Sequence, residues 1–157
     1  MRPVISSVEE LRGYIGQVIS VSDWQEVTQE RVNQFADATG DHQYIHVDPE
    51  RAAKTFFDGT IAHGYLTLSM THPVGEHPEG IRVDLGGKLA VNYGLNRVRF
   101  PAPVPVGSRV RQRVMLTAVE EISNQAVQLT HTRTVEIEGS DNDKPACVAE
   151  TLMRIYY

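Results

Sequence analysis

The hydrophobic and polar positions change their period along the chain, from helical spacing in the first half to alternation in the second. At the N-terminus, Ser7 and Glu10 have the spacing of a capping box, which predicts a short helix. That helix is expected to begin at Val8 and to end at Gly13 or Gly16, and residues 17–21 then have the pattern of a short strand.

A second helix is predicted after Thr28, which is a suitable N-cap residue. Four residues at spacings of three and four form one stripe that is expected to be buried: Val32, Phe35, Ala36 and Thr39. Gly40 is well placed to end this helix because glycine readily adopts the left-handed conformation of a helix C-terminus.

The segment from Asp41 to Gly59 is expected to be irregular, apart from a helical turn that Asp48 can cap and Pro49 can start. Residues 61–71 are apolar and small, and a proline follows them. This segment predicts a buried helix that begins near Gly64.

The second half of the chain alternates with the period of β-strands. The apolar faces of four long strands are expected at Leu89-Val91-Tyr93-Leu95 with a bulge at Gly94, at Val110-Val114-Leu116, at Val127-Leu129-Val135-Ile137, and along Ala146–Tyr157, which is apolar on both faces as in a central strand. An order of helices followed by a run of antiparallel strands is typical of the α+β class. One apolar helix before four long strands suggests a curved sheet wrapped around that helix, in a single domain of residues 1–157.

Composition excludes several classes of protein. The net charge of −5 argues against a general nucleic-acid binder. No apolar run approaches the roughly 20 residues that span a bilayer, so no membrane partner is expected. The first residues lack the apolar stretch of a secretory signal, and the single cysteine, Cys147, fits a reducing compartment. A cytoplasmic protein is therefore expected.

Positive charge is concentrated between Leu85 and Val119, where there is no aspartate or glutamate. The basic residues of this segment are Lys88, Arg97, Arg99, Arg109, Arg111 and Arg113. They fit either a solvated strand surface or a binding surface for an anionic group such as a phosphate.

Asp41 and His46 are the first candidates for chemistry, because they lie in an expected loop directly after a helix end. Five residues of extended or turning chain can bring a carboxylate and an imidazole to one water molecule. Spacing alone is weak evidence. Asp41 also suits a simple turn, and His46 a structural position in the core.

Three segments resemble a known family. They are Phe35–His46 followed by Ala52, then Ile61-Ala62-His63-Gly64, and then Val98–Gly107. The first resembles the hydratase 2 motif of MaoC-like dehydratases and (R)-specific enoyl-CoA hydratases, and the other two resemble the start of that family's central helix and a turn between its strands. The chain departs from the motif at Gln43 and Tyr44, where Asn and Pro are usual, which concerns substrate fit more than reaction type.

The resemblance implies a hot-dog fold, in which an antiparallel sheet wraps around a long central helix, and a homodimer. It implies a lyase of fatty acid metabolism that adds water reversibly and syn to a trans-2-enoyl thioester and gives a (3R)-3-hydroxyacyl thioester. The substrate is carried by CoA or by acyl carrier protein, and no separate cofactor is expected. The catalytic Asp and His of the family correspond to Asp41 and His46.

Roles for these residues follow from the charge that the reaction develops. Asp41 is expected to take a proton from water and to return one to C2, while His46 holds and polarises that water, although the two roles could be exchanged. The backbone N–H of Gly64 is the expected donor to the thioester oxygen. His63 is a candidate for substrate binding or for support of the loop.

Lys88 and Arg97 are the candidates for binding the CoA phosphates. No metal site is expected: His42 stands close to Asp41 and Asp48 in sequence, but there is no cysteine cluster or HExxH pattern. His131 and Arg133 lie on the otherwise apolar face of their strand, where a pocket and a dimer interface are both open as explanations.

Two other functions compete with hydration. A hot-dog acyl-thioester hydrolase can carry a catalytic carboxylate on the central helix, but Tyr65–Thr71 contains no Asp or Glu. A non-catalytic hot-dog module could bind an acyl ligand or a partner protein. The presence of both Asp41 and His46 argues against that module.

Overall fold

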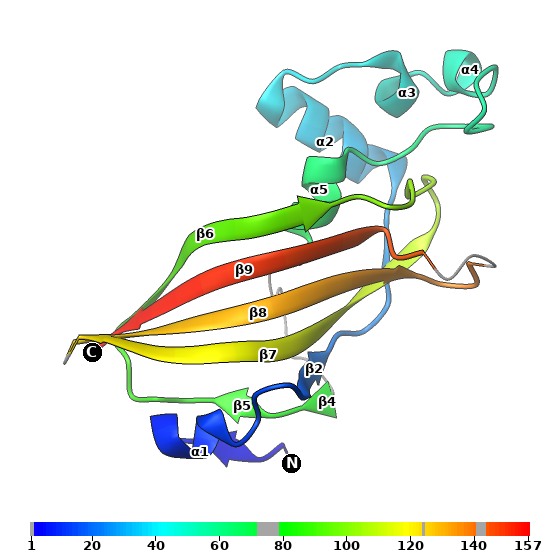
Figure 1. Cartoon of the computed structure of the whole chain (residues 1–157). Helices are drawn as coiled ribbons and strands as arrows, with labels where there is room; N and C mark the ends of the chain where they lie inside the picture. The colour runs from blue at the N-terminus through cyan, green and yellow to red at the C-terminus, as the bar shows by residue number, and fades with distance from the viewer. Residues whose placement is uncertain (1, 72–78, 124, 141–143) are drawn as a thin grey trace.

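An antiparallel sheet forms the body of the protein in the computed structural model, which describes residues 2–71, 79–123, 125–140 and 144–157 (Figure 1). The strand order is β4-β2-β7-β8-β9-β6, and β3 pairs with β7. These strands are β2 (Val18–Val21), β3 (Gln25–Glu26), β4 (Glu79–Gly80), β6 (Leu89–Arg99), β7 (Arg109–Ser123), β8 (Ala126–Ile137) and β9 (Cys147–Tyr156). Two short strands, β1 (Val4–Ile5) and β5 (Arg82–Val83), pair in parallel as a separate ribbon.

The four predicted long strands are all present, but the expected apolar face of β6 is not buried, since Leu89, Tyr93 and Leu95 are exposed. On β7, Val110, Val114 and Leu116 are buried. The register of β6 against β9 shifts between Asn92 and Gly94, so the predicted bulge is confirmed. β9 pairs with β8 on one side and with β6 on the other, as its two apolar faces indicated.

The first two predicted helices are present. In α1 (Val8–Arg12) the Ser7 hydroxyl accepts a hydrogen bond from the Glu10 N–H at 3.2 Å. α2 (Gln29–Thr39) ends at Gly40, which has φ 77°. The predicted stripe is wrong at its last position: Thr39 is exposed and donates its hydroxyl to a carbonyl of its own helix.

Two one-turn helices follow, α3 (Tyr44–Val47) and α4 (Pro49–Ala52). The cap on α4 is confirmed, because the Asp48 carboxylate accepts from the Arg51 N–H at 3.0 Å. The expectation of a non-helical chain around His46 is wrong, since His46 lies in α3. The helix is short and has no side-chain cap, so the sequence carries little signal for it.

α5 (Gly64–Ser69) begins where the sequence predicted and is six residues long, shorter than the helix that the resemblance implied. Leu66 packs with Val32 of α2, Val135 of β8 and Ala149 of β9 in one buried cluster. This cluster fixes α2 and α5 against the sheet, and Figure 1 shows α2 to α5 gathered at the end of the sheet where β6 ends. Tyr65, on the outer side of α5, is 71% exposed.

Cys147 is fully buried, and burial raises the pKa of its thiol to about 11. The thiol is therefore unreactive, and Cys147 packs as part of the hydrophobic core. None of the helices that the structure describes has the length and apolar character needed to cross a membrane.

Candidate active site

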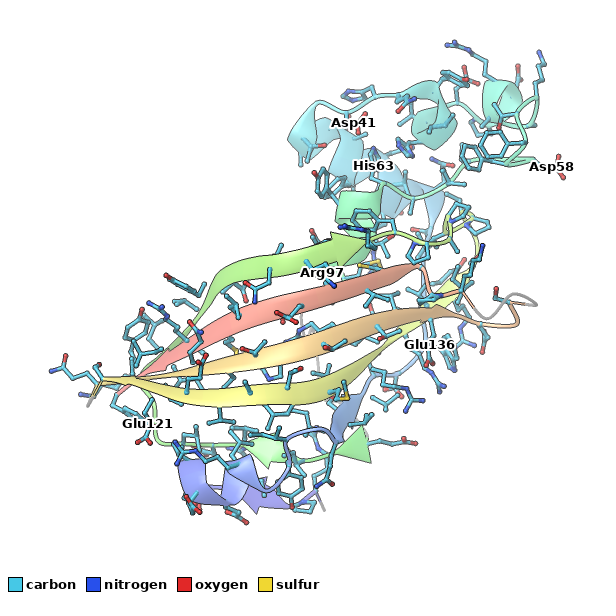
Figure 2. All side chains as sticks on the ribbon, viewed as in Figure 1. Asp41, Asp58, His63, Arg97, Glu121 and Glu136 are labelled. Atoms are coloured by element: carbon cyan, nitrogen blue, oxygen red, sulfur yellow. The ribbon has the colours of Figure 1, made fainter. Side chains whose placement is uncertain are left out.

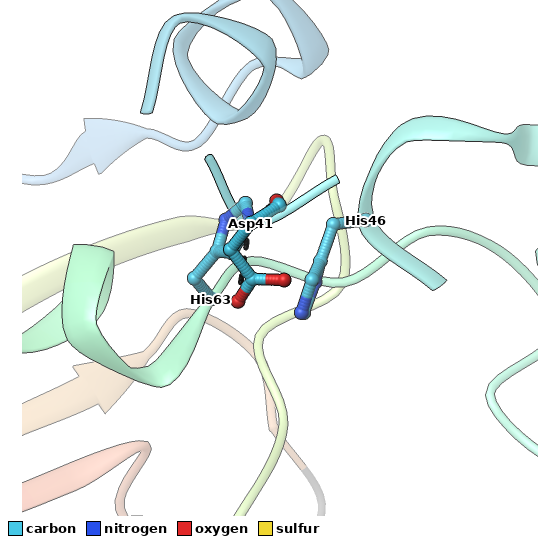
Figure 3. A group of neighbouring side chains, drawn as sticks. All are labelled: Asp41, His46 and His63. Atoms are coloured by element: carbon cyan, nitrogen blue, oxygen red, sulfur yellow. Dashed lines mark hydrogen bonds and ion pairs between the residues drawn. The ribbon is translucent and has the colours of Figure 1, made fainter. Parts of the chain in front are cut away.

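Three side chains from separate elements meet at the helical end of the sheet. Asp41 follows α2, His46 lies in α3, and His63 immediately precedes α5. One polar atom from each lies within 4.8 Å of the others. Figure 3 shows the Asp41 carboxylate beside the His46 ring. The predicted convergence of Asp41 and His46 is present, with His63 as a third member.

The position of Asp41 is set by the end of α2. Gly40 adopts the left-handed conformation there, which turns the chain out of the helix. The Asp41 carboxylate accepts a hydrogen bond from the Gln43 N–H at 3.4 Å, and its side chain is 53% exposed. One edge of this carboxylate is therefore open to solvent while the other faces His46.

His46 is buried and has a defined tautomer. Its Nδ1 lies 2.7 Å from the backbone carbonyl oxygen of Ile61. Because a carbonyl only accepts, Nδ1 carries the hydrogen and Nε2 keeps a free lone pair. Burial lowers the pKa of His46, so the ring is neutral at pH 7. This histidine is prepared to accept a hydrogen bond rather than to donate one.

His63 is buried behind the other two residues. Its Nε2 donates to the Asp41 backbone carbonyl at 2.9 Å. Its ring stacks on His46 with centroids 3.8 Å apart, and Phe35 packs on it at 5.0 Å. Through these contacts His63 supports the loop that carries Asp41. Binding of substrate by His63 stays a prediction.

Gln29 is a supporting residue that sequence reasoning missed. Its Nε2 donates to the His46 backbone carbonyl at 2.7 Å, and its Oε1 accepts from the Thr60 hydroxyl at 2.6 Å. It thus ties α2 to α3 and to the segment before α5. A glutamine at the first position of a helix is common, so the sequence offered no signal for this role.

A cavity of about 340 Å³ opens beside these residues. His46, Gly64 and Thr67 line it, together with apolar side chains that include Phe57, Phe100, Ala102 and Val104. As the first residue of α5, Gly64 has an N–H without a partner inside the helix. A Cβ atom at this position would lie 3.1 Å from the Phe100 ring, so glycine also keeps this wall of the cavity open.

The geometry of the three residues suits a water molecule better than a metal ion. One water molecule can bridge two of these polar atoms, which lie up to 4.8 Å apart, since each hydrogen bond spans about 2.8 Å. A metal ion lies in the plane of each imidazole that binds it, whereas the two rings are stacked with an angle of 28° between them. His42 lies apart from this cluster, exposed, with its ring 2.9 Å from Asp37.

The two candidates for phosphate binding lie at opposite ends of β6. Arg97 is exposed near the end that leads to Phe100, and Figure 2 shows it on the sheet while Asp41 and His63 lie among the helices. Lys88 precedes the first residue of the strand. The nine positions from Lys88 to Arg97 correspond to roughly 30 Å at about 3.3 Å per residue. The structure therefore does not bring Lys88 to this cavity.

Three of the other basic residues of this region have acidic partners, whereas Arg99 donates to the Val98 carbonyl. Arg109 pairs with Glu138 at 3.0 Å, and Arg111 and Arg113 both pair with Glu136, at 2.7 and 3.1 Å. These three arginines therefore form ion pairs on the strand surface, which favours the first of the two interpretations that the sequence allowed, a solvated strand surface.

Comparison with known proteins agrees with this geometry. Residues 10–137 match the model of the MaoC like domain. The chain is 55% identical to 3-hydroxyacyl-thioester dehydratase Z of Mycobacterium tuberculosis, over 94% of this chain and 95% of that protein. It is 41% identical to nodulation protein N of Rhizobium leguminosarum bv. viciae, over 96% and 92%.

Solved structures give the same family and fold. The (R)-hydratase from A. caviae involved in PHA biosynthesis superposes with a TM-score of 0.68 at 27% identity, covering 87% of this chain and 95% of that one. The chain therefore belongs to the family of MaoC like domains and has the hot-dog fold.

Proposed function

We propose that the protein is an (R)-specific enoyl-thioester hydratase, which adds water reversibly to a trans-2-enoyl thioester to give a (3R)-3-hydroxyacyl thioester. The observation that carries this proposal is the Asp41 carboxylate beside the free Nε2 of His46, next to a cavity that Gly64 lines. The relative from Mycobacterium tuberculosis is named as a dehydratase, which is the same reaction in reverse.

Water is activated because both catalytic groups accept hydrogen bonds. An ionised carboxylate and a neutral imidazole with Nδ1 protonated each accept one hydrogen of the same water. Both hydrogens are then engaged, and an oxygen lone pair is free to attack C3 of the enoyl group. Asp41 takes one proton as the C3–O bond forms, and His46 fixes the orientation of the water.

Negative charge moves to the thioester oxygen as C3 is attacked. The Gly64 N–H is the proposed donor to that oxygen. Because α5 has six residues, the donor itself matters more than the helix dipole. Asp41 then returns its proton to C2 on the face from which water entered, which gives syn addition. One O–H bond of water and the π bond between C2 and C3 break, and one C–O and one C–H bond form.

The wider assignment follows from this chemistry. The substrate is an acyl thioester of CoA or acyl carrier protein, with Arg97 in contact with a phosphate. The proposed reaction uses no cofactor. We place the protein in the fatty acid metabolism of the cytoplasm.

We also propose a homodimer formed along β6. This strand pairs with β9 on one side and is at the end of the sheet order. Three large hydrophobic side chains on it are about half exposed: Leu89, Tyr93 and Leu95. A long apolar edge of this kind favours pairing with a second strand. Light scattering coupled to gel filtration should give the mass of two chains, and the mass of one chain would contradict this part.

Hydration is tested by product analysis with crotonyl-CoA. We expect loss of enoyl absorbance, a (3R)-3-hydroxybutyryl thioester by chiral chromatography, and no free thiol. Release of free CoA would instead indicate the hydrolase. Binding of crotonyl-CoA without any turnover would indicate the non-catalytic module.

A further inference from the structure

Two polar side chains interrupt the apolar inner face of β8, away from the catalytic residues. His131 is 3% exposed and Arg133 is 8% exposed. Both residues lie among buried hydrophobic neighbours, Val114 and Leu129 among them. A buried cation is costly unless it is paired, so this position calls for a physical reason.

Arg133 has hydrogen bonds but no counter-ion in the described parts of the chain. Its Nη1 donates to the Thr71 carbonyl at 2.6 Å and to the Gln112 side chain at 3.1 Å, and its Nε donates to the Thr151 hydroxyl at 3.1 Å. A guanidinium has five N–H donors. The two on Nη2 have no partner among the described residues, and the positive charge faces no described carboxylate.

Two neighbouring polar atoms also lack partners within the described structure. They are Nδ1 of His131 and the hydroxyl oxygen of Ser20, both sealed from outside solvent. Burial lowers the pKa of His131 to about 4, so at pH 7 its ring is neutral and offers one N–H donor and one acceptor. Unsatisfied buried groups are rare in native proteins and often mark a ligand or water site.

The three residues that carry these groups line a cavity, and a second cavity adjoins it. A cavity of about 440 Å³ has Ser20, His131 and Arg133 in its wall, and the rest of that wall is largely apolar. A second cavity, of about 260 Å³, shares Asn92, Arg133 and Met153 with the first and touches the last turn of α5. The combination of an apolar body and a few polar groups is typical of a small-molecule site.

We propose that this cavity binds a carboxylate at the end of an unbranched alkyl chain. The Nη2 donors of Arg133 and the ring N–H of His131 hold the carboxylate oxygens, and the apolar wall holds the chain. Such charge-assisted hydrogen bonds are about twice as strong as neutral ones. The carboxylate also supplies the counter-ion that the buried guanidinium lacks in the described structure.

Two sources share this chemistry. One is a free fatty acid, which would occupy the cavity as a second ligand. The other is an acyl thioester substrate with a carboxylate at its far end, and this source rests on the proposed hydratase function.

The site itself is tested without any substrate, by calorimetric titration of the protein with decanoate and with decan-1-ol. We expect decanoate to bind at least about tenfold more tightly, which corresponds to about 1.4 kcal/mol. Arg133→Gln should remove this preference, and Arg109→Gln, a change in an exposed arginine of β7, should retain it. Equal affinity for the acid and the alcohol in the unaltered protein would overturn the proposal even if Arg133→Gln fails to fold.

The source is distinguished by kinetics with two 2-enoyl-CoA substrates of equal length, one ending in a methyl group and one in a carboxylate. If the substrate supplies the carboxylate, the carboxylate form has the lower KM in the unaltered protein, and Arg133→Gln abolishes the difference. If a free fatty acid supplies the carboxylate instead, the two substrates have the same KM and decanoate still binds to the protein. Absence of any hydration would refute the proposed function, while the decanoate titration would still decide the site.

Discussion

The imidazole rings of His46 and His63 stack with their centroids 3.8 Å apart, although 17 positions separate them in sequence. A second imidazole stacked on His46 disfavours a positive charge on the His46 ring. The presence of His63 accordingly lowers the pKa of His46, in addition to the larger effect of burial. The pair thus keeps neutral the ring whose Nε2 faces the proposed water.

Asp41→Asn and His46→Gln are each expected to lower kcat for hydration by at least about 10²-fold, because each removes one acceptor from the water. Steady-state assays with crotonyl-CoA measure this, with circular dichroism to verify folding. His42→Gln is the matched control, since His42 is an exposed histidine in the same segment, and it should keep near-normal activity. A folded variant at either site with normal turnover would remove that residue from the mechanism.

The pH dependence follows from the neutral form of His46. Its pKa is lowered from 6.5, so the acceptor is lost only when the pH falls below that value. The acidic limb of kcat/KM should therefore lie below pH 6.5, with a plateau above it.

His63→Gln tests the coupling between the rings. Because His63 lowers the pKa of His46, its removal should move the acidic limb to higher pH. Loss of the hydrogen bond to Asp41 should also reduce kcat more than it changes KM. If the acidic limb of kcat/KM stays at the same pH and the variant only loses folding stability, the role of His63 is structural alone.

Gly64→Ala should lower kcat, since the added Cβ lies 3.1 Å from the Phe100 ring at the wall of the cavity. A double variant separates two causes. If the loss comes from pressure on the ring, Phe100→Leu should restore activity in the Gly64→Ala background. If the methyl group crowds the thioester, the double variant stays slow. Unchanged kinetics in Gly64→Ala would remove the proposed contact.

His131 predicts a loss of stability in acid. Its pKa is about 4 in the folded chain and 6.5 in the unfolded chain, so the unfolded state binds more protons between these values. Stability is expected to fall as the pH drops from about 6.5 towards 4, by about 3 kcal/mol at 1.36 kcal/mol per pH unit. Urea unfolding across this range should show the decline, and His131→Leu should reduce it. If the free energy of unfolding falls equally with pH in the unaltered protein and in His131→Leu, this prediction is contradicted.

The sequence predicted the parts of the site that lie close together along the chain. The end of α2 at Gly40, the short path from Asp41 to His46 and the start of α5 near Gly64 are visible as local patterns. α3 could not be predicted in this way, because no capping residue marks its start in the sequence. Contacts from Gln29 and from the Ile61 carbonyl hold it in place, and both come from distant positions in the sequence.

The surroundings of His131 and Arg133 show the same limit. Alternation placed both residues on the inner face of a strand. It gave no information on the cavity in front of them, because that space depends on how six strands from different parts of the chain curve together.

His63 Nε2 donates to the backbone carbonyl of Asp41 at 2.9 Å, whereas the Asp41 carboxylate lies farther from it, at 4.0 Å. Removing that carboxylate should therefore leave the loop in place and open a small vacancy, reachable from outside because the side chain is 53% exposed. A small external acid such as formate could diffuse into this vacancy and act in place of the lost group. Chemical rescue of Asp41→Gly by formate, with none for His46→Gly, would show that the scaffold holds its shape without the residue that it serves.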